Sequence, residues 1–159
     1  MLRKVRHKKV QLSGGTFAIV ASRYNARYVD AMVRAAQNEL KRAGAKRIQI
    51  VRVPGAYEIP VVAAKLVRTG QFSAIICLGL ILRGETVHAA HIGEAVSRAL
   101  MEIQLVLEIP VIHEVLLLEN EGQARVRCLN PKHNRGTEAA QTALAMARVM
   151  KSLDSESAF

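Results

Sequence analysis

The sequence has few aromatic residues, few cysteines and no long apolar run. Its six aromatic residues include no tryptophan, so it offers no aromatic-rich basic stripe on which nucleic-acid bases would stack. No apolar stretch approaches the roughly 20 residues that a membrane span needs, and the amino terminus lacks the apolar core of a signal peptide. We therefore expect a cytoplasmic protein with no membrane partner and without nucleic acid as its ligand.

The two cysteines do not suggest a disulfide framework. Cys77 lies inside an apolar run, whereas Cys128 lies in a charged segment. Two isolated cysteines in a chain of this size are typical of reduced thiols in a reducing compartment.

Positive charge is abundant, with a formal net charge of +10. Five lysines and arginines fall within the first nine residues, and we interpret residues 1–12 as a basic arm. Two interpretations of the arm stay open, a solvated terminus or a contact with a polyanion. The rest, residues 13–154, is long enough for one hydrophobic core and is expected to form a single domain.

Apolar runs alternate with helical patterns along the chain. The patterns predict strands at 16–22, 47–53, 73–82 and 110–118, and helices at 29–44, 59–70, 88–108 and 134–153. Because right-handed crossovers place helices on both faces of a parallel sheet, this order predicts an α/β protein. The expected architecture is a three-layer α/β/α fold around a four-stranded parallel sheet.

Polar side chains follow each of the first three predicted strands. These loops are residues 23–25 (RYN), 54–58 (PGAYE) and 83–88 (RGETVH). In parallel sheets the carboxyl ends of the strands meet at one edge, where ligands bind. The three loops are therefore expected to share one crevice.

The third loop has the composition of a phosphate site. Backbone N–H groups after Gly84 and the hydroxyl of Thr86 would meet an anion where the long helix opens, although the same residues are also typical of a simple helix cap. His88 is expected one turn inside that helix, within reach of the same ligand, and an imidazole can transfer protons near neutral pH.

A metal site is the less favoured alternative for these residues. His88 and His91 lie three residues apart, and Glu85, Glu94 and His113 would complete a ligand shell. The spacing lacks the glutamate of the HExxH motif, so we expect no metal.

Six sequence blocks remain to be explained together: YN (24–25), VPGAYEIP (53–60), LGLILRGETVH (78–88), EIPVIHEVL (108–116), QARVRC (123–128) and NRGTEAA (134–140). In this order they resemble the signature blocks of the lumazine synthase family, and the match runs from about Thr16 to Met150. The resemblance implies a flavodoxin-like fold and a cofactor-free condensation of 5-amino-6-(D-ribitylamino)uracil with 3,4-dihydroxy-2-butanone 4-phosphate, which gives 6,7-dimethyl-8-ribityllumazine and phosphate in riboflavin biosynthesis.

The resemblance also implies roles for individual residues. Tyr24 would stack on the pyrimidine, Glu58 would bind the ribityl hydroxyls, and His88 would transfer protons. The implied pyrimidine and ribityl contacts are Tyr24, Asn25, Ala56, Tyr57, Glu58, His113 and Arg135, and the implied phosphate contacts are Gly84, Glu85, Thr86 and Arg127. The family further implies a homopentamer or a larger assembly of pentamers, sites shared between neighbouring subunits, and riboflavin synthase as a further partner.

The chain departs from the family pattern at several of these positions. Ala89 and Ala90 stand where an aromatic residue and an acid are common, and His113 stands where phenylalanine is usual. Arg135 replaces the more usual lysine. Arg135 and Glu138 have a second interpretation, as charges that flank the start of a helix. A non-catalytic relative that binds flavin or a polyanion is the alternative function.

Overall fold

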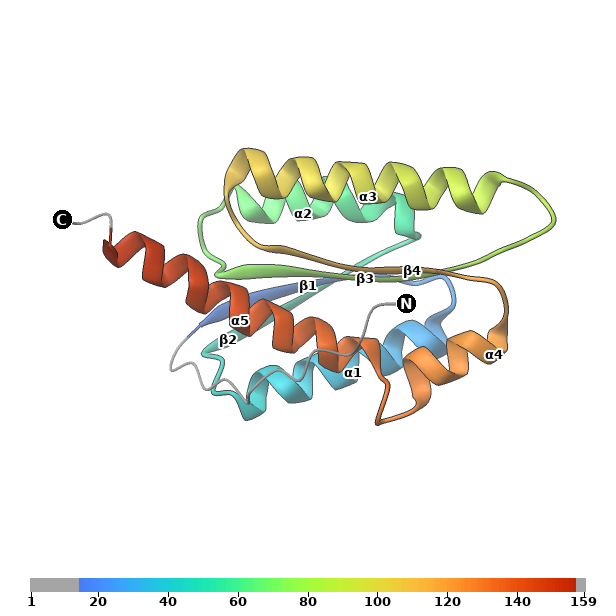
Figure 1. The fold of residues 1–159 in the computed structure, drawn as a ribbon, viewed down its shortest axis with the longest axis horizontal. Helices are drawn as coiled ribbons and strands as arrows, with labels where there is room; N and C mark the ends of the chain where they lie inside the picture. The colour runs from blue at the N-terminus through green and yellow to red at the C-terminus, as the bar shows by residue number, and fades with distance from the viewer. Residues whose placement is uncertain (1–14, 157–159) are drawn as a thin grey trace.

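The computed structural model describes residues 15–156 and contains one four-stranded parallel sheet with the strand order β2-β1-β3-β4. Helices cover both faces of this sheet (Figure 1). The predicted α/β/α architecture is therefore confirmed. The strands are β1 (Thr16–Ser22), β2 (Arg47–Val53), β3 (Ala74–Leu82) and β4 (Val111–Leu118). The helices are α1 (Ala26–Arg42), α2 (Ile59–Val67), α3 (His88–Leu107), α4 (Glu121–Ala124) and α5 (Arg135–Glu156), with short helical turns η1 (Ala56–Glu58) and η2 (Arg125–Leu129).

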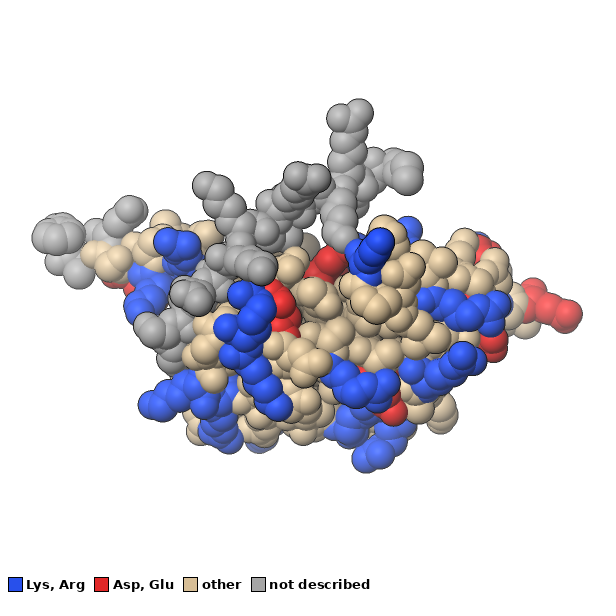
Figure 2. Space-filling model, turned by 90° about the horizontal axis from the view of Figure 1, so that it is seen from below, with Lys and Arg blue, Asp and Glu red and all other residues tan. Residues whose placement is uncertain are grey.

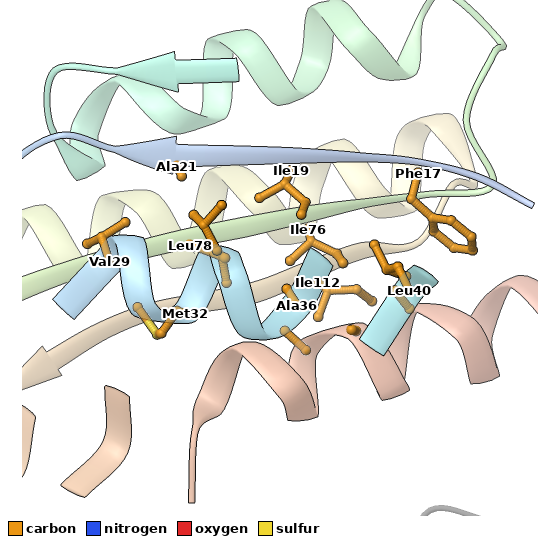
Figure 3. Close-up of a cluster of buried hydrophobic side chains, with 14 of the residues drawn as sticks. Phe17, Ile19, Ala21, Val29, Met32, Ala36, Leu40, Ile76, Leu78 and Ile112 are labelled. Carbon is orange, nitrogen blue, oxygen red and sulfur yellow. The ribbon is translucent and has the colours of Figure 1, made fainter. Parts of the chain in front are cut away.

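The sheet separates two hydrophobic cores. On one face, α1 and α5 pack over strand side chains such as Phe17, Ile76 and Leu78, all fully buried (Figure 3). On the other face, α2 and α3 pack over the alternate side chains of the same strands, among them Val20 and Ile75. Successive side chains of a strand point to opposite faces, so a strand covered by helices on both sides must be apolar at every position. This explains the continuous apolar run of β3.

Several element ends differ from the predictions by up to three residues, among them the end of α2 at Val67 and the end of α5 at Glu156, and one segment was not predicted. Helix α1 begins at Ala26, three residues before the predicted start, because Asn25 adopts a left-handed conformation (φ 58°) that turns the chain directly from the strand loop into the helix. Asparagine tolerates this conformation better than most residues. The segment α4–η2 was not predicted, since a short helix shows no hydrophobic periodicity.

Basic side chains outnumber acidic ones on the face that α1 and α5 cover (Figure 2). Several of these cations have local partners. Arg42 pairs with Glu39 at 2.7 Å, and Arg52 pairs with Asp30 at 2.7 Å. The predicted basic arm, residues 1–12, lies outside the described residues.

Within residues 15–156, no helix combines the length and the apolar character needed to cross a membrane.

Candidate active site

A cavity of about 840 Å³ opens at the carboxyl ends of β1, β2 and β3. Its size is typical of small-molecule sites. The loops after β1 and β2, the end of β3 and the first turns of α3 form its walls, so the structure brings together residues that lie up to 71 positions apart in the chain. Six predicted site residues line it: Tyr24, Asn25, Ala56, Tyr57, Glu58 and His88.

Asn25 joins two of these walls. Its side-chain Nδ2 donates a hydrogen bond of 2.8 Å to the carbonyl oxygen of Leu80 at the end of β3. The amide therefore holds the loop after β1 against its neighbouring strand, and this contact accounts for the asparagine without a ligand.

Gly55 shapes the second wall, and the sequence analysis missed it. Its N–H donates a 2.8 Å hydrogen bond to Oε2 of Glu58, which orients the carboxylate. A Cβ atom built on Gly55 would lie 2.9 Å from Cδ2 of Tyr24 and 3.0 Å from Oε2 of Glu58. Real Cβ contacts are longer, so only glycine fits without moving both side chains. The sequence feature that could have identified Gly55 is the PGAYE motif, residues 54–58.

Two phenol rings stand at the mouth of the cavity. Tyr24 is 68% exposed and Tyr57 is 64% exposed. Exposed aromatic side chains beside an apolar hollow provide flat surfaces that a planar ligand can cover.

The loop of Gly84, Glu85 and Thr86 is exposed and lies outside the cavity lining. Helix α3 begins at His88, where the predicted helix 88–108 also begins. His88 is therefore the first helical residue, and the expectation that it lies one turn inside the helix is wrong. The Thr86 Oγ1 accepts a weak hydrogen bond of 3.4 Å from the His88 N–H, as a capping hydroxyl would. The loop is anchored by Arg83, which pairs with Glu119 at 2.8 Å.

The alternative metal site would be built around His88 and His91. His91 lines the cavity near His88, but the described part of the chain contains no group of three or more histidine, cysteine or acidic side chains that could hold a metal ion.

His113, Arg127 and Arg135 do not line the cavity. His113 lies on β4, the edge strand of the sheet, and its ring contacts α3. Arg127 is exposed on η2, beside a second hollow at the end of β4. Within one chain these three residues therefore lie apart from the residues that line the cavity.

Arg135 is held by two carboxylates. Its guanidinium donates to both oxygens of the buried Glu114, at 3.0 and 2.8 Å, and to Glu138 at 2.6 Å. Burial lowers the pKa of Arg135, but the hydrogen bond and charge of Glu114 and the charge of Glu138 more than offset this effect, so the pKa is raised overall. Burial raises the pKa of the Glu114 carboxyl, an effect that Arg135 and Arg127 oppose. Glu114 was not predicted; the signal was an acid flanked by apolar residues on a strand.

Comparison with known proteins gives one consistent family. The family described as 6,7-dimethyl-8-ribityllumazine synthase matches residues 14–151. A protein of that name from Xanthomonas oryzae pv. oryzae (strain PXO99A) is 40% identical over 139 residues, which cover 86% of this chain and 90% of that protein. Another of the same name, from Xylella fastidiosa (strain M12), is 39% identical over 143 residues, which cover 89% of this chain and 93% of that protein. The matched residues include all residues that line the cavity, and also Arg135 with its partners Glu114 and Glu138.

Proposed function

This chain belongs to the 6,7-dimethyl-8-ribityllumazine synthase family, and on that basis we propose that its cavity is the site of lumazine formation. The enzyme is a transferase of riboflavin biosynthesis. It condenses 5-amino-6-(D-ribitylamino)uracil with 3,4-dihydroxy-2-butanone 4-phosphate and releases phosphate, without a cofactor. The observation that carries the proposal is the cavity itself, in which an aromatic ring, a fixed carboxylate and an imidazole converge from three different loops.

The pyrimidine and its ribityl chain occupy the walls after β1 and β2. A planar ring covers the exposed face of Tyr24, while the backbone at Ala56 and Tyr57 borders it and Asn25 keeps the wall in place. One oxygen of Glu58 is already used by Gly55. Since a carboxylate has two oxygens, the second can accept hydrogen bonds from ribityl hydroxyls.

The phosphate of the second substrate lies at the exposed loop of Gly84, Glu85 and Thr86, at the amino-terminal end of α3. A Cβ atom built on Gly84 meets nothing within 4 Å, so the backbone is open to a ligand. The positive end of the helix dipole and the Thr86 hydroxyl favour an anion there.

His88 transfers protons between these two subsites. It stands at the junction of the phosphate loop and the cavity. The condensation requires proton transfers during imine formation, phosphate loss and ring closure, and histidine both accepts and donates protons near neutral pH.

A neighbouring subunit completes the site in a homopentamer or a larger assembly of pentamers. His113, Arg127 and Arg135, which lie outside the cavity of their own chain, then reach the cavity of the next chain. Large apolar side chains on α3 support the assembly, because Leu105 is 68% exposed and Val106 is 71% exposed, and such surface usually marks an interface.

We place the enzyme in the cytoplasm. Cys77 and Cys128 are both free and buried, which suits a reducing compartment.

The test is to mix both substrates with the purified protein and to follow the fluorescent lumazine. We expect product at a rate above the uncatalysed reaction. A protein that gives no rate enhancement, yet retains bound flavin or a polyanion through purification, would favour the non-catalytic alternative instead.

A further inference from the structure

Ser97 on α3 and His113 on β4 form a hydrogen-bonded pair outside the cavity. The Ser97 Oγ lies 2.7 Å from His113 Nε2 and 2.8 Å from the carbonyl oxygen of Gly93, to which it donates. On the other side of the ring, the N–H of Val115 donates to His113 Nδ1 at 3.2 Å. Both ring nitrogens are therefore engaged.

These contacts allow only one arrangement of protons. The Val115 N–H can only donate, so Nδ1 must present its lone pair. The single hydroxyl proton of Ser97 is used by the Gly93 carbonyl, so Oγ must accept from the ring. The proton of His113 consequently lies on Nε2. A second proton on Nδ1 would face the Val115 N–H. Burial of the ring separately disfavours that proton, because it lowers the pKa of the His113 imidazole.

The Ser97–His113 hydrogen bond fixes the plane of the imidazole ring at the β4 edge of the sheet. Strand β4 is the last strand of the sheet, and His113 is exposed there although both of its nitrogens are bonded within the chain. An unrestrained imidazole would turn about χ2 to hydrogen-bond water or a ligand edge-on. A ring with both nitrogens occupied presents mainly its faces, as phenylalanine does.

We propose that Ser97 is a positioning residue that makes His113 a stacking platform for the pyrimidine bound in the neighbouring subunit. The inference rests on the proposed function and adds a residue to it. Ser97 never touches the substrate. It acts by holding the plane and the tautomer of the ring that does.

The experiment compares Ser97→Ala with Ser97→Thr in the wild-type protein and tests Ser97→Ala again in the His113→Phe variant. Loss of one hydrogen bond that orients the ring should raise the KM for the pyrimidine about 2- to 10-fold, while kcat changes less than about twofold, an expectation from the absence of substrate contact. Ser97→Thr keeps the hydroxyl and should restore the wild-type KM. When His113→Phe is present, Ser97→Ala should have no further effect, since phenylalanine has no nitrogen to hold.

Ser152→Ala is the matched control. Ser152 also donates from an exposed helix to a backbone carbonyl, that of Val149 at 2.7 Å, but its hydroxyl contacts no imidazole. Its loss should leave the KM for the pyrimidine unchanged. An equal rise of the KM for the pyrimidine in Ser97→Ala and Ser152→Ala would mean that Ser97 acts only on helix stability. That result would overturn the proposal.

A spectroscopic readout tests the pair without turnover. NMR of protein labelled with ¹⁵N in its five histidines should show His113 protonated at Nε2. The exchange of this ring N–H proton with water should become faster in Ser97→Ala. A His113 protonated at Nδ1 would overturn the arrangement.

Two failures are distinguishable. If wild-type protein gives no lumazine, the proposed function is wrong. If wild-type protein is active but His113→Ala leaves the KM for the pyrimidine unchanged, the stacking platform is wrong while the proposed function stands.

Discussion

At the scale of single residues, His88 lines the cavity and is the proposed junction of the two subsites. His88→Ala should slow turnover by about 10²- to 10⁴-fold, with the lower end expected because proximity alone also promotes this condensation. Substrate binding should persist, since the cavity walls remain. Single-turnover kinetics measure the effect. His91→Ala removes an imidazole from the same cavity lining and should cost much less. An unchanged single-turnover rate in His88→Ala would remove His88 from the mechanism.

Arg127 is the proposed phosphate ligand, and its loss should affect phosphate binding but not pyrimidine binding. Arg127→Ala should weaken inhibition by inorganic phosphate about 10- to 100-fold, because hydrogen bonds to a charged group are among the strongest in proteins. The KM for the pyrimidine should change little. Arg125→Ala removes an exposed guanidinium two residues away, where it pairs with Glu121 at 3.6 Å, and serves as the control. Equal phosphate inhibition of wild type and Arg127→Ala would place the phosphate elsewhere.

His113 should make stability depend on pH. Burial lowers the pKa of its imidazole below the ordinary value of 6.5, so the unfolded chain binds more protons than the native protein in the interval between the two values. The free energy of unfolding should therefore fall as the pH drops below about 6.5 and stop responding to this group below its native pKa. Urea midpoints of wild type and His113→Phe across this range measure the contribution. The fall should be shallower in the variant, and parallel curves would refute the assignment.

At the scale of elements, the contact between α1 and α5 depends on one glycine. A Cβ atom built on Gly136 would overlap the carbonyl group of Met32, which is backbone and cannot rotate away. Asn134, two residues earlier, caps α5 by accepting the Gly136 N–H at 2.8 Å and donates to the Cys128 carbonyl at 2.5 Å. The start of α5 is thus held against α1 at Gly136 and against η2 at Asn134.

Gly136→Ala should destabilise the protein by about 3 kcal/mol or more, since overpacking against backbone must separate the two helices. Chemical denaturation measures the loss. Gly93→Ala is the control, because a Cβ there makes only an ordinary 3.6 Å contact with Leu117 and alanine favours the helix by up to about 1 kcal/mol. A Gly136→Ala protein as stable as wild type would show that α5 can shift without cost.

At the scale of the whole molecule, the predicted site residues His113, Arg127 and Arg135 lie outside the cavity of their own chain. Subunits carrying His88→Ala and subunits carrying Arg127→Ala should complement one another when they are unfolded and reassembled together. Some interfaces then pair an intact His88 with an intact Arg127 from the adjacent chain. Activity well above the mean of the two parents supports shared sites. Mixed assemblies that contain both chains but reach only that mean would place each site within one subunit.

The sequence by itself determined the sheet, the layers and the meeting of the three loops that line the cavity. Burial requires apolar runs of recognisable period, so the four strands and the long helices could be predicted from hydrophobicity alone. The meeting of Tyr24, Glu58 and His88 also follows from the chain, because parallel strands bring the loops after their carboxyl ends to one edge. The residue roles within that edge came from the resemblance to the family.

Only the tertiary structure decided which polar groups bind one another. Glu114 and Arg135 are 21 residues apart, and Ser97 and His113 are 16 apart; no pattern in the chain marks them as partners. Gly55 likewise matters because of two side chains that approach it in space. Burial is averaged over a whole face and therefore leaves a periodic trace in the sequence, whereas a hydrogen bond depends on the positions of two atoms that only the packed elements bring within 3 Å of each other.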